Sequence, residues 1–292
     1  MATLRIVLGP TAVGKTDYAI ALAREAASPV VSCDSRQVFR ELNIGVARPG
    51  PVQLASVKHY FIATRSVCEP YTAGLFEMEA LALLEQLFKT HETVIMAGGS
   101  GLYIDALCNG LDDFPEADPE LRAHLSGRLR TEGVAALRAE LRILDPESFA
   151  ALDPANGQRI VRALEVTIAT GRKFSSFKTH APKQRPFAIE KVGLTRPREE
   201  LYGRIDRRVD MMMEQGLLDE VRSLLPYRDL PALNTVGYKE LFEYLDGRHD
   251  LAEAVRLIKR NTRRYAKKQL SWWGRDPSVR WVNLPEPSGS GN

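Results

Sequence analysis

This 292-residue sequence has few cysteines and no long apolar run. Cys33, Cys68 and Cys108 lie far apart in the sequence, with no C-x-x-C pair and no histidine arrangement beside them. We therefore expect neither a disulfide framework nor a zinc site. No apolar stretch approaches the roughly 18 residues that span a bilayer, and the first residues lack a signal-peptide pattern. We therefore expect a protein without a membrane segment that works in a reducing cytoplasm.

A strong net charge is also missing, because 40 basic and 37 acidic side chains give only +3. The charges are unevenly distributed. Residues 1–118 carry 9 Lys/Arg and 14 Asp/Glu, a balance of −5, and residues 119–292 carry 31 and 23, a balance of +8. The second part of the chain is therefore the part in which a polyanionic partner is expected.

Strands and helices alternate in the first third of the sequence. Apolar β-branched runs predict strands at residues 4–8, 29–32 and 93–97, and helical spacing predicts helices at 17–27 and 75–89. From 121 to about 170 only helical patterns occur, and 187–194 again predicts a strand. We expect an α/β fold, a P-loop NTPase-like parallel sheet core (1–115 and 191–284), with an all-helical insertion domain (116–190) and a flexible tail (285–292).

A phosphate-binding loop directly follows the first predicted strand. The G-x-x-x-x-G-K-T sequence lies between a strand and a helix, as this loop requires. Its backbone N–H groups and the helix N-terminus favour phosphate oxygens, Lys15 adds a positive charge, and Thr16 can ligate Mg²⁺. The predicted diphosphate-binding residues are Gly9, Pro10, Thr11, Ala12, Val13, Gly14, Lys15 and Thr16.

The third predicted strand argues against nucleoside triphosphate hydrolysis. It ends in Gly98-Gly99-Ser100, where a Mg²⁺-binding carboxylate is expected in an ATPase, and the sequence has no N-K-x-D guanine-recognition motif. A nucleotide or nucleoside kinase that places its acidic residues elsewhere stays open.

The second predicted strand ends at Asp34, on the same edge of the sheet as the phosphate loop. A carboxylate at this place can act as a general base or ligate a metal, and capping a helix N-terminus is the ordinary alternative. Ser35 and Gln37 beside it can contact a nucleobase edge.

Residues 254–275 contain eight basic residues and no acidic one. Lys259, Arg263 and Lys267 recur at helical spacing, which predicts one positively charged face suited to a phosphate backbone. A solvated surface is the alternative for such a run, and Trp272 and Trp273 within it are expected to pack in the core. Arginine pairs at 159/162 and 204/208 can clamp a diphosphate or RNA, although ion pairing is the commoner use.

Together these segments carry a resemblance. The segments GPTAVGKT, CDSRQVF, IGVARP, GGSGLYIDAL, QR-x-x-RALEV, VGYKE and R-x-x-AKKQ-x-x-W stand in the order and at the spacing of the tRNA dimethylallyltransferase family, over about residues 5–283. The resemblance implies transfer of a dimethylallyl group from dimethylallyl diphosphate to N6 of the adenosine at tRNA position 37, beside the anticodon. It also implies Mg²⁺, the tRNA anticodon stem-loop as partner and, because zinc-finger cysteines are absent, a compact bacterial form that we expect to be monomeric.

The resemblance further implies roles for individual residues. Asp34 matches the general base, Arg204 the arginine that neutralises the leaving diphosphate, and Ser100 a further catalytic position. Thr16 matches the Mg²⁺ contact. The residues that match tRNA-binding stretches are Ser35, Arg36, Gln37, Ser100, Arg122, Gln158, Arg159, Ile160, Val161, Arg162, Asn234, Gly237, Tyr238, Lys239, Lys267, Lys268 and Gln269.

The sequence departs from the family pattern at four positions. Ser100 replaces a threonine and keeps the hydroxyl group. Val46 and Arg48 replace the threonine and lysine of I-G-T-A-K-P, and Ala63 replaces the aspartate of H-x-L-I-D, so no role is transferred to these three. Two other classes stay open: a P-loop nucleotide or nucleoside kinase, and a non-catalytic RNA-binding protein.

Overall fold

The computed structural model describes residues 1–115, 118–179 and 181–284, so the predicted flexible tail (285–292) lies outside the described residues. The chain divides into two compact units, Met1–Cys108 with Gln184–Asn292, and Asn109–Lys183. The sequence-based bounds of the insertion, 116–190, differ from this division. Arg185 belongs to the first unit because its guanidinium donates to the Glu77 carboxylate (2.6 Å) and to the Leu107 carbonyl (2.7 Å).

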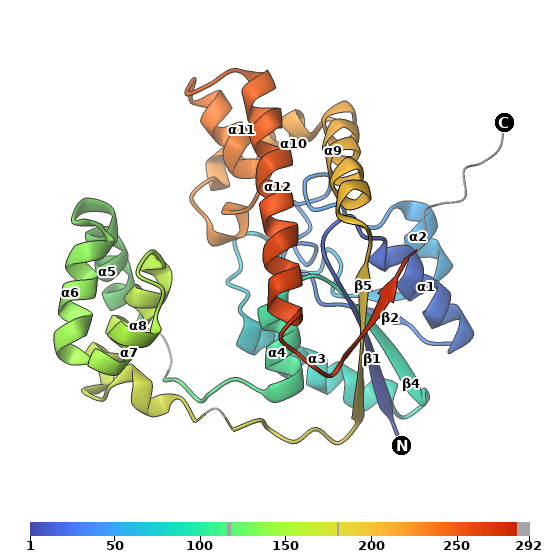
Figure 1. The fold of residues 1–292 in the computed structure, drawn as a ribbon, viewed down its shortest axis with the longest axis horizontal. Coiled ribbons are helices and arrows are strands. Elements are labelled where there is room, and N and C mark those ends of the chain that lie inside the picture. Colours follow the sequence, from blue (N-terminus) through green and yellow to red (C-terminus); the bar gives the residue numbers. More distant parts are fainter. Residues whose placement is uncertain (116–117, 180, 285–292) are drawn as a thin grey trace. The chain divides into compact units, whose positions relative to one another are not determined.

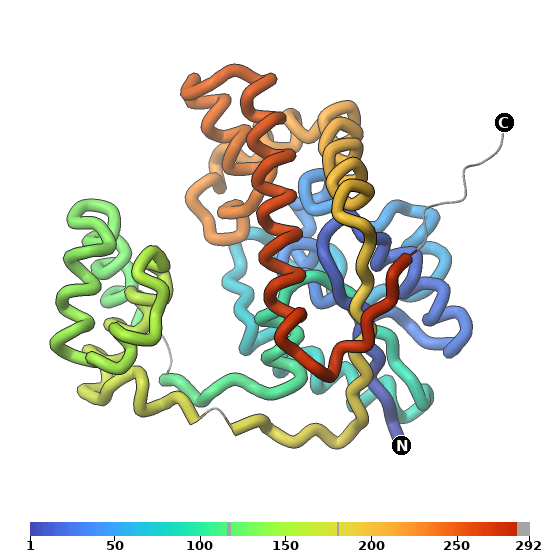
Figure 2. The backbone as a smooth tube through the Cα atoms, viewed as in Figure 1, coloured from blue at the N-terminus to red at the C-terminus, as the bar shows by residue number. Residues whose placement is uncertain are grey.

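A six-stranded parallel sheet forms the centre of the first unit (Figure 1). Its order is β3-β2-β4-β1-β5-β6, and β1 pairs with β5 although they are far apart in the sequence (Figure 2). The α/β fold predicted from the sequence is confirmed, and the carboxyl ends of β1, β2 and β4 meet at one edge. The strands are β1 (Thr3–Leu8), β2 (Val30–Ser32), β3 (His59–Tyr60), β4 (Thr93–Ala97), β5 (Ala188–Thr195) and β6 (Val279–Asn283).

Two of these strands are absent from the sequence-based expectation, and both lie at an edge of the sheet. β3 has only two residues, which is too short for a periodic pattern, and β6 follows a long helix. Each pairs with one neighbour, β2 and β5 respectively. Their existence depends on a partner strand that local sequence does not encode.

Helices make up most of the remaining described chain. In the first unit they are α1 (Lys15–Glu25), α2 (Pro51–Ser56), α3 (Ala73–Leu87), α4 (Gly101–Asn109), α9 (Arg198–Glu214), α10 (Leu217–Ser223), α11 (Tyr238–Leu245) and α12 (Leu251–Trp273). In the second unit they are α5 (Pro119–Thr131), α6 (Gly133–Leu144), α7 (Pro146–Ala151) and α8 (Gly157–Thr170). Within the described ranges, no helix is both long and apolar enough to cross a membrane.

The turn between β1 and α1 requires a glycine at its first position. Leu4, Ile6 and Leu8 of β1 are fully buried, as expected for a central parallel strand covered on both faces. Gly9 follows with φ +144°, and a Cβ atom there would lie 2.7 Å from the Leu194 carbonyl oxygen of β5. The phosphate loop can therefore leave the sheet only because this residue has no side chain.

The second unit is helical throughout its regular structure. α5, α6 and α8 bury leucines such as Leu125, Leu141 and Leu164 against one another. The Asp145 carboxylate, fully buried, accepts hydrogen bonds from the backbone and hydroxyl groups of Ser148 and Ser175. These four bonds join α7 to the segment after α8 and lower the pKa of Asp145 against the opposing effect of burial.

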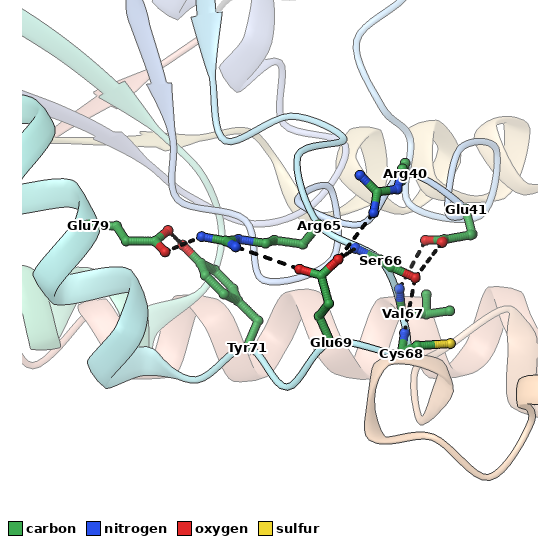
Figure 3. Close-up of polar contacts among 9 residues, drawn as sticks. All are labelled: Arg40, Glu41, Arg65, Ser66, Val67, Cys68, Glu69, Tyr71 and Glu79. Carbon is green, nitrogen blue, oxygen red and sulfur yellow. Dashed lines mark hydrogen bonds and ion pairs between the residues drawn. The ribbon is translucent and has the colours of Figure 1, made fainter.

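A polar network fixes the segment between β3 and α3 beside the chain that follows β2 (Figure 3). Arg65 pairs with Glu79 and with Glu69 (3.6 Å), and the Tyr71 hydroxyl donates to Glu79 (2.8 Å). Backbone bonds from residues 63–65 to the carbonyls of residues 37 and 38 continue this contact. The segment directly after Asp34 is thereby held on its outer side. The other members shown are Arg40, Glu41, Ser66, Val67 and Cys68.

Candidate active site

The phosphate loop holds its lysine against its own backbone. Lys15 Nζ donates to the carbonyl oxygens of Gly9 (2.9 Å) and Pro10 (2.8 Å). Burial lowers the pKa of Lys15 to about 8, and the negative charge of Asp34 partly offsets this effect. An anionic ligand that takes these hydrogen bonds would stabilise the charged lysine, so the loop is prepared for a phosphate group.

Three arginines from β5–α9 surround the same loop. Arg196 Nε donates to the Val13 carbonyl (2.8 Å), Arg204 Nε donates to the Ala12 carbonyl (2.8 Å), and Arg208 Nη1 lies 3.5 Å from Thr11 Oγ1. Burial lowers the pKa of Arg204 and of Arg208, and each is lowered further by a neighbouring arginine. Such a desolvated cluster of cations favours binding of a polyanion. The i, i+4 spacing of Arg204 and Arg208 predicted a pair that can clamp a diphosphate, whereas the family resemblance implied a role for Arg204 alone.

Asp34 lies where β2 ends and holds the turn that follows it. Its Oδ1 atom accepts hydrogen bonds from the backbone N–H of Arg36 (2.8 Å) and of Gln37 (3.2 Å). Both bonds end on Oδ1, so neither of them occupies the other carboxylate oxygen, Oδ2. One oxygen therefore fixes the side chain across a turn, while the second remains available for chemistry. Residues 35–38 form this turn rather than a helix, so the alternative role of capping a helix N-terminus is not what Asp34 has here.

Two cavities share Asp34 as part of their wall. The P-loop cavity has a volume of about 330 Å³, and its lining includes the phosphate loop, Arg204 and Arg208 as well as the apolar side chains of Ile44, Ile62 and Met211. The α11 cavity, of about 420 Å³, is lined by Asn234, Gly237 and Lys239. The residues common to both are Thr11, Asp34, Val46, Ala47, Arg208, Met212 and Tyr265. A group bound in one cavity can thus reach a group bound in the other at Asp34.

Residues 43–50, which we call the strap, form part of the wall between these cavities. Glu220 of α10 accepts hydrogen bonds from the strap N–H groups of Asn43 (3.2 Å), Ile44 (2.7 Å) and Gly45 (3.1 Å). Its Oε1 atom also accepts from the Tyr238 hydroxyl (2.6 Å). A Cβ atom on Gly45 would lie 2.6 Å from the Tyr238 ring, so the strap packs directly on this buried side chain.

The opposite side of the strap is held by Gln37. Its side-chain Nε2 donates to the carbonyl oxygens of Val46 (3.2 Å) and Ala47 (3.0 Å). The side-chain N–H groups of Gln37 are therefore used to bind the strap. Gln37 also lines the P-loop cavity, where its amide oxygen can accept a hydrogen bond from a ligand. The IGVARP motif lies within the strap, but local sequence does not indicate its partners, because Glu220 and Tyr238 come from distant segments.

The Glu220→Gln variant is expected to lower the free energy of unfolding by about 1–3 kcal/mol and to raise the KM of the phosphate-bearing substrate several-fold. The amide retains one acceptor oxygen and turns a donor toward other donors, so strap N–H groups lose their partner. Denaturant unfolding and steady-state kinetics measure the two effects. Glu214→Gln, on an exposed residue of α9, is the matched control, and equal behaviour of the two variants would contradict the role of Glu220.

Several predicted tRNA-binding residues gather around these cavities. Ser35, Arg36, Asn234, Gly237 and Lys239 line the α11 cavity. A further cavity of about 330 Å³, the tryptophan cavity, is lined by Ser35, Ser100, Tyr265, Lys268, Gln269 and Trp272. Ser100 Oγ accepts from the Ser35 N–H (2.9 Å) and donates to the Ser35 hydroxyl (3.0 Å), so the two residues act as one unit.

Other predicted contacts have side chains that the fold uses internally. Gln269 is 6% exposed; its oxygen accepts from the Thr11 N–H (2.8 Å) and its nitrogen donates to the Gly99 carbonyl (2.8 Å). Tyr238 is fully buried, and Ile160 and Val161 pack in the core of the second unit. The roles of these residues in tRNA binding stay predictions.

The positively charged face predicted on α12 is partly neutralised. Lys259 pairs with Asp210 (2.6 Å) and Arg263 pairs with Asp206 (2.5 Å), both on α9. Lys267 of the same series is exposed. Trp273 packs in the core as expected, whereas Trp272 is 43% exposed and donates from Nε1 to Asp105 (2.9 Å), which corrects the prediction for that residue. Sequence spacing predicts the helix face but not the two aspartates of α9 that pair with it.

In the second unit, Gln158 and Arg159 are exposed at the start of α8, whereas Arg122 and Arg162 bind the nearly buried Glu165. Glu165 is 1% exposed, and its Oε2 accepts from Arg122 Nε (3.0 Å) and Nη2 (2.6 Å). Both arginines therefore hold a buried carboxylate besides any contact with RNA.

We expect Arg122→Met to destabilise α8 by about 1–2 kcal/mol even without RNA, because Glu165 keeps only the Arg162 partner. The estimate is reduced because the Arg122 side chain is 44% exposed. Hydrogen exchange of the α8 backbone amides measures the effect. Arg130→Met, on an exposed residue of α5, is the control, and unchanged α8 protection in Arg122→Met would show that the ion pair contributes nothing.

A phosphate loop lined by arginines, next to a second cavity and with a carboxylate that lines both, defines a P-loop enzyme that brings two substrates together. The comparisons narrow this class. The IPP transferase family model matches residues 37–276. The chain is 51% identical to tRNA dimethylallyltransferase 1 of Porphyromonas gingivalis, over 99% of this chain and 96% of that protein.

Two further comparisons agree. The chain is 50% identical to tRNA dimethylallyltransferase 1 of Bacteroides thetaiotaomicron, over 97% of this chain and 92% of that protein. It also resembles the crystal structure of a tRNA isopentenylpyrophosphate transferase from Bacillus halodurans, with a TM-score of 0.71 and 36% identity, over 97% of this chain and 90% of that one. The chain therefore belongs to the IPP transferase family, and the resemblance and the P-loop NTPase-like fold inferred from the sequence are confirmed.

Proposed function

We propose that this protein transfers a dimethylallyl group from dimethylallyl diphosphate to N6 of the adenosine at tRNA position 37, beside the anticodon. The observation that carries the proposal is the position of Asp34, which lines both the P-loop cavity and the α11 cavity. The diphosphate would occupy the first cavity, and the adenine the second. A tRNA-modifying transferase, rather than a kinase or a non-catalytic RNA-binding protein, is the function that membership of the family supports.

In the proposed reaction, the adenine N6 attacks C1 of the prenyl group while the bond between C1 and the diphosphate oxygen breaks. Asp34 Oδ2 accepts the proton that N6 loses, and Oδ1 keeps the carboxylate in place through its two backbone bonds. Lys15, Arg204 and Arg208 stabilise the charge that develops on the leaving diphosphate. Ser100 supports the Ser35 backbone beside Asp34, and the prenyl carbons would contact the apolar side chains that line the P-loop cavity.

The donor groups at the phosphate loop fit the proposed Mg²⁺. The Thr16 hydroxyl and the Asp17 side chain are hard oxygen ligands that line the P-loop cavity, and Asp17 is held by Gln53 Nε2 (2.6 Å). Mg²⁺ commonly takes few protein ligands and binds mainly to water and substrate phosphates. When bound, the ion would supply positive charge that offsets the charge of the diphosphate.

Mass spectrometry of an anticodon stem-loop, incubated with dimethylallyl diphosphate and Mg²⁺, tests the proposal. We expect the stem-loop to gain one dimethylallyl unit on the adenosine beside the anticodon. Radiolabelled ATP in a parallel reaction should remain unused, because no phosphoryl group is transferred. An unchanged mass for every adenosine-containing anticodon loop tried would reject the proposed function.

A further inference from the structure

A third cavity continues the P-loop cavity on the side of the strap. This strap cavity has a volume of about 900 Å³. It shares seven lining residues with the P-loop cavity, among them Ile44, Pro49, His59 and Ile62. Within the described part of the chain, phosphate-loop residues 9–16 do not line the strap cavity. The strap cavity therefore continues the P-loop cavity along residues that do not belong to the phosphate loop.

The lining of the strap cavity is largely apolar. Pro51 and Leu54 of α2, together with Ala63, extend the apolar wall beyond the residues that it shares with the P-loop cavity. Its polar members are Asn43, Arg48, Lys58, His59 and Gln215, and the aliphatic parts of the Arg48, Lys58 and Gln215 side chains can cover an apolar ligand. A hydrocarbon chain that leaves the P-loop cavity would thus remain in contact with apolar side chains.

Three of the four departures from the family sequence pattern lie on the walls of the P-loop and strap cavities, whereas Ser100 lines the tryptophan cavity. Val46 lines the P-loop cavity, Arg48 lines both the P-loop and the strap cavity, and Ala63 lines the strap cavity. At two of the three, Val46 and Ala63, an apolar side chain stands where the pattern has a hydroxyl or a carboxylate. Each of these two changes removes a group that an adjacent hydrocarbon would have to desolvate.

We propose that the donor site accepts prenyl diphosphates longer than dimethylallyl diphosphate, with the additional isoprene units lying in the strap cavity. The inference rests on the proposed function and concerns the same reaction. For geranyl diphosphate, N6 attacks C1, the bond from C1 to the diphosphate oxygen breaks, diphosphate leaves, and the proton passes to Asp34. The product is an adenosine that carries a ten-carbon group.

A competition experiment tests this inference. Equal concentrations of dimethylallyl and geranyl diphosphate are incubated with the full chain, Mg²⁺ and an anticodon stem-loop, and the two products are counted by mass. We expect the geranyl product to reach at least about a tenth of the total, whereas a closed pocket would exclude the larger donor by roughly a hundredfold or more. If the dimethylallyl product forms without the geranyl product, this inference is overturned and the proposed function stands. No product of either kind rejects both.

Two variants locate the additional isoprene unit. Leu54→Trp fills the strap cavity and should reduce geranyl transfer about tenfold while dimethylallyl transfer stays within about twofold. Val52→Trp, the same change on an 84% exposed residue of α2, is the matched control. Ala63→Asp should have the same selective effect, and aspartate is tolerated at the φ of +53° that Ala63 adopts. If both variants fold and use geranyl diphosphate as the natural sequence does, the strap cavity does not hold the chain.

Discussion

The Asp34→Asn variant is expected to lower the turnover of prenyl transfer by about two or more orders of magnitude while the tRNA remains bound. Asparagine has the same shape as aspartate, and its side-chain oxygen can still accept from the N–H groups of Arg36 and Gln37. The turn after β2 is therefore preserved. What is lost is the acceptor for the N6 proton, since a neutral amide is far less basic than a carboxylate.

Single-turnover kinetics at saturating donor measures the chemical step, and fluorescence anisotropy with a labelled stem-loop measures binding. Asp246→Asn, which removes a carboxylate that pairs with Arg228, is the control for a lost charge. Turnover close to that of the natural sequence would exclude Asp34 as the base. Loss of RNA binding together with turnover would instead assign Asp34 to holding the turn alone.

Local sequence was sufficient for the parts of the site that a single segment builds. The phosphate loop needs a buried strand, glycines and a helix start within residues 4–25, and all of these are consecutive. Asp34 could be predicted in the same way, because a short buried strand ends directly before it. The edge where these strands end then follows from parallel pairing.

Residues that reach the site from distant segments could not be predicted from spacing. Arg196, which no spacing pattern indicated, meets the phosphate loop only because β5 pairs with β1. Glu220 appeared as an ordinary helix carboxylate, yet it holds three N–H groups of the strap. Tyr265 lines three cavities at once, which no local pattern indicates.

The sequence also does not show in which direction a side chain points, and this was the other limit of the prediction. The family motifs select Gln269 and Tyr238 for tRNA binding, but both side chains form buried bonds within the first unit. A motif contains residues that shape a site as well as residues that touch a ligand. Only the structure distinguishes the two kinds. For Gln269, the bonds to Thr11 and Gly99 join the phosphate loop to the turn after β4.

Lys15→Met is expected to lower kcat/KM for the prenyl diphosphate by about 10²–10³-fold, because the loop loses a positive charge directed at the leaving diphosphate. A pH dependence should disappear with it. The cationic form binds the diphosphate, and burial lowers the pKa of Lys15 to about 8 in the free protein. In the natural sequence, kcat/KM should therefore fall as the pH rises through about 8.

Two neighbouring groups, Tyr265 and Cys33, do not titrate in this interval. Burial raises the pKa of Tyr265 to about 12 and raises that of Cys33 further, so both stay protonated while Lys15 loses its proton. Initial rates at low donor concentration, between about pH 7 and pH 9.5, measure the decline. Lys89→Met, on an exposed residue after α3, should keep both the rate and the pH profile. Since bound diphosphate stabilises the cation, kcat at saturation should decline only at higher pH, and a flat kcat/KM profile in the natural sequence would show that Lys15 is not the titrating group.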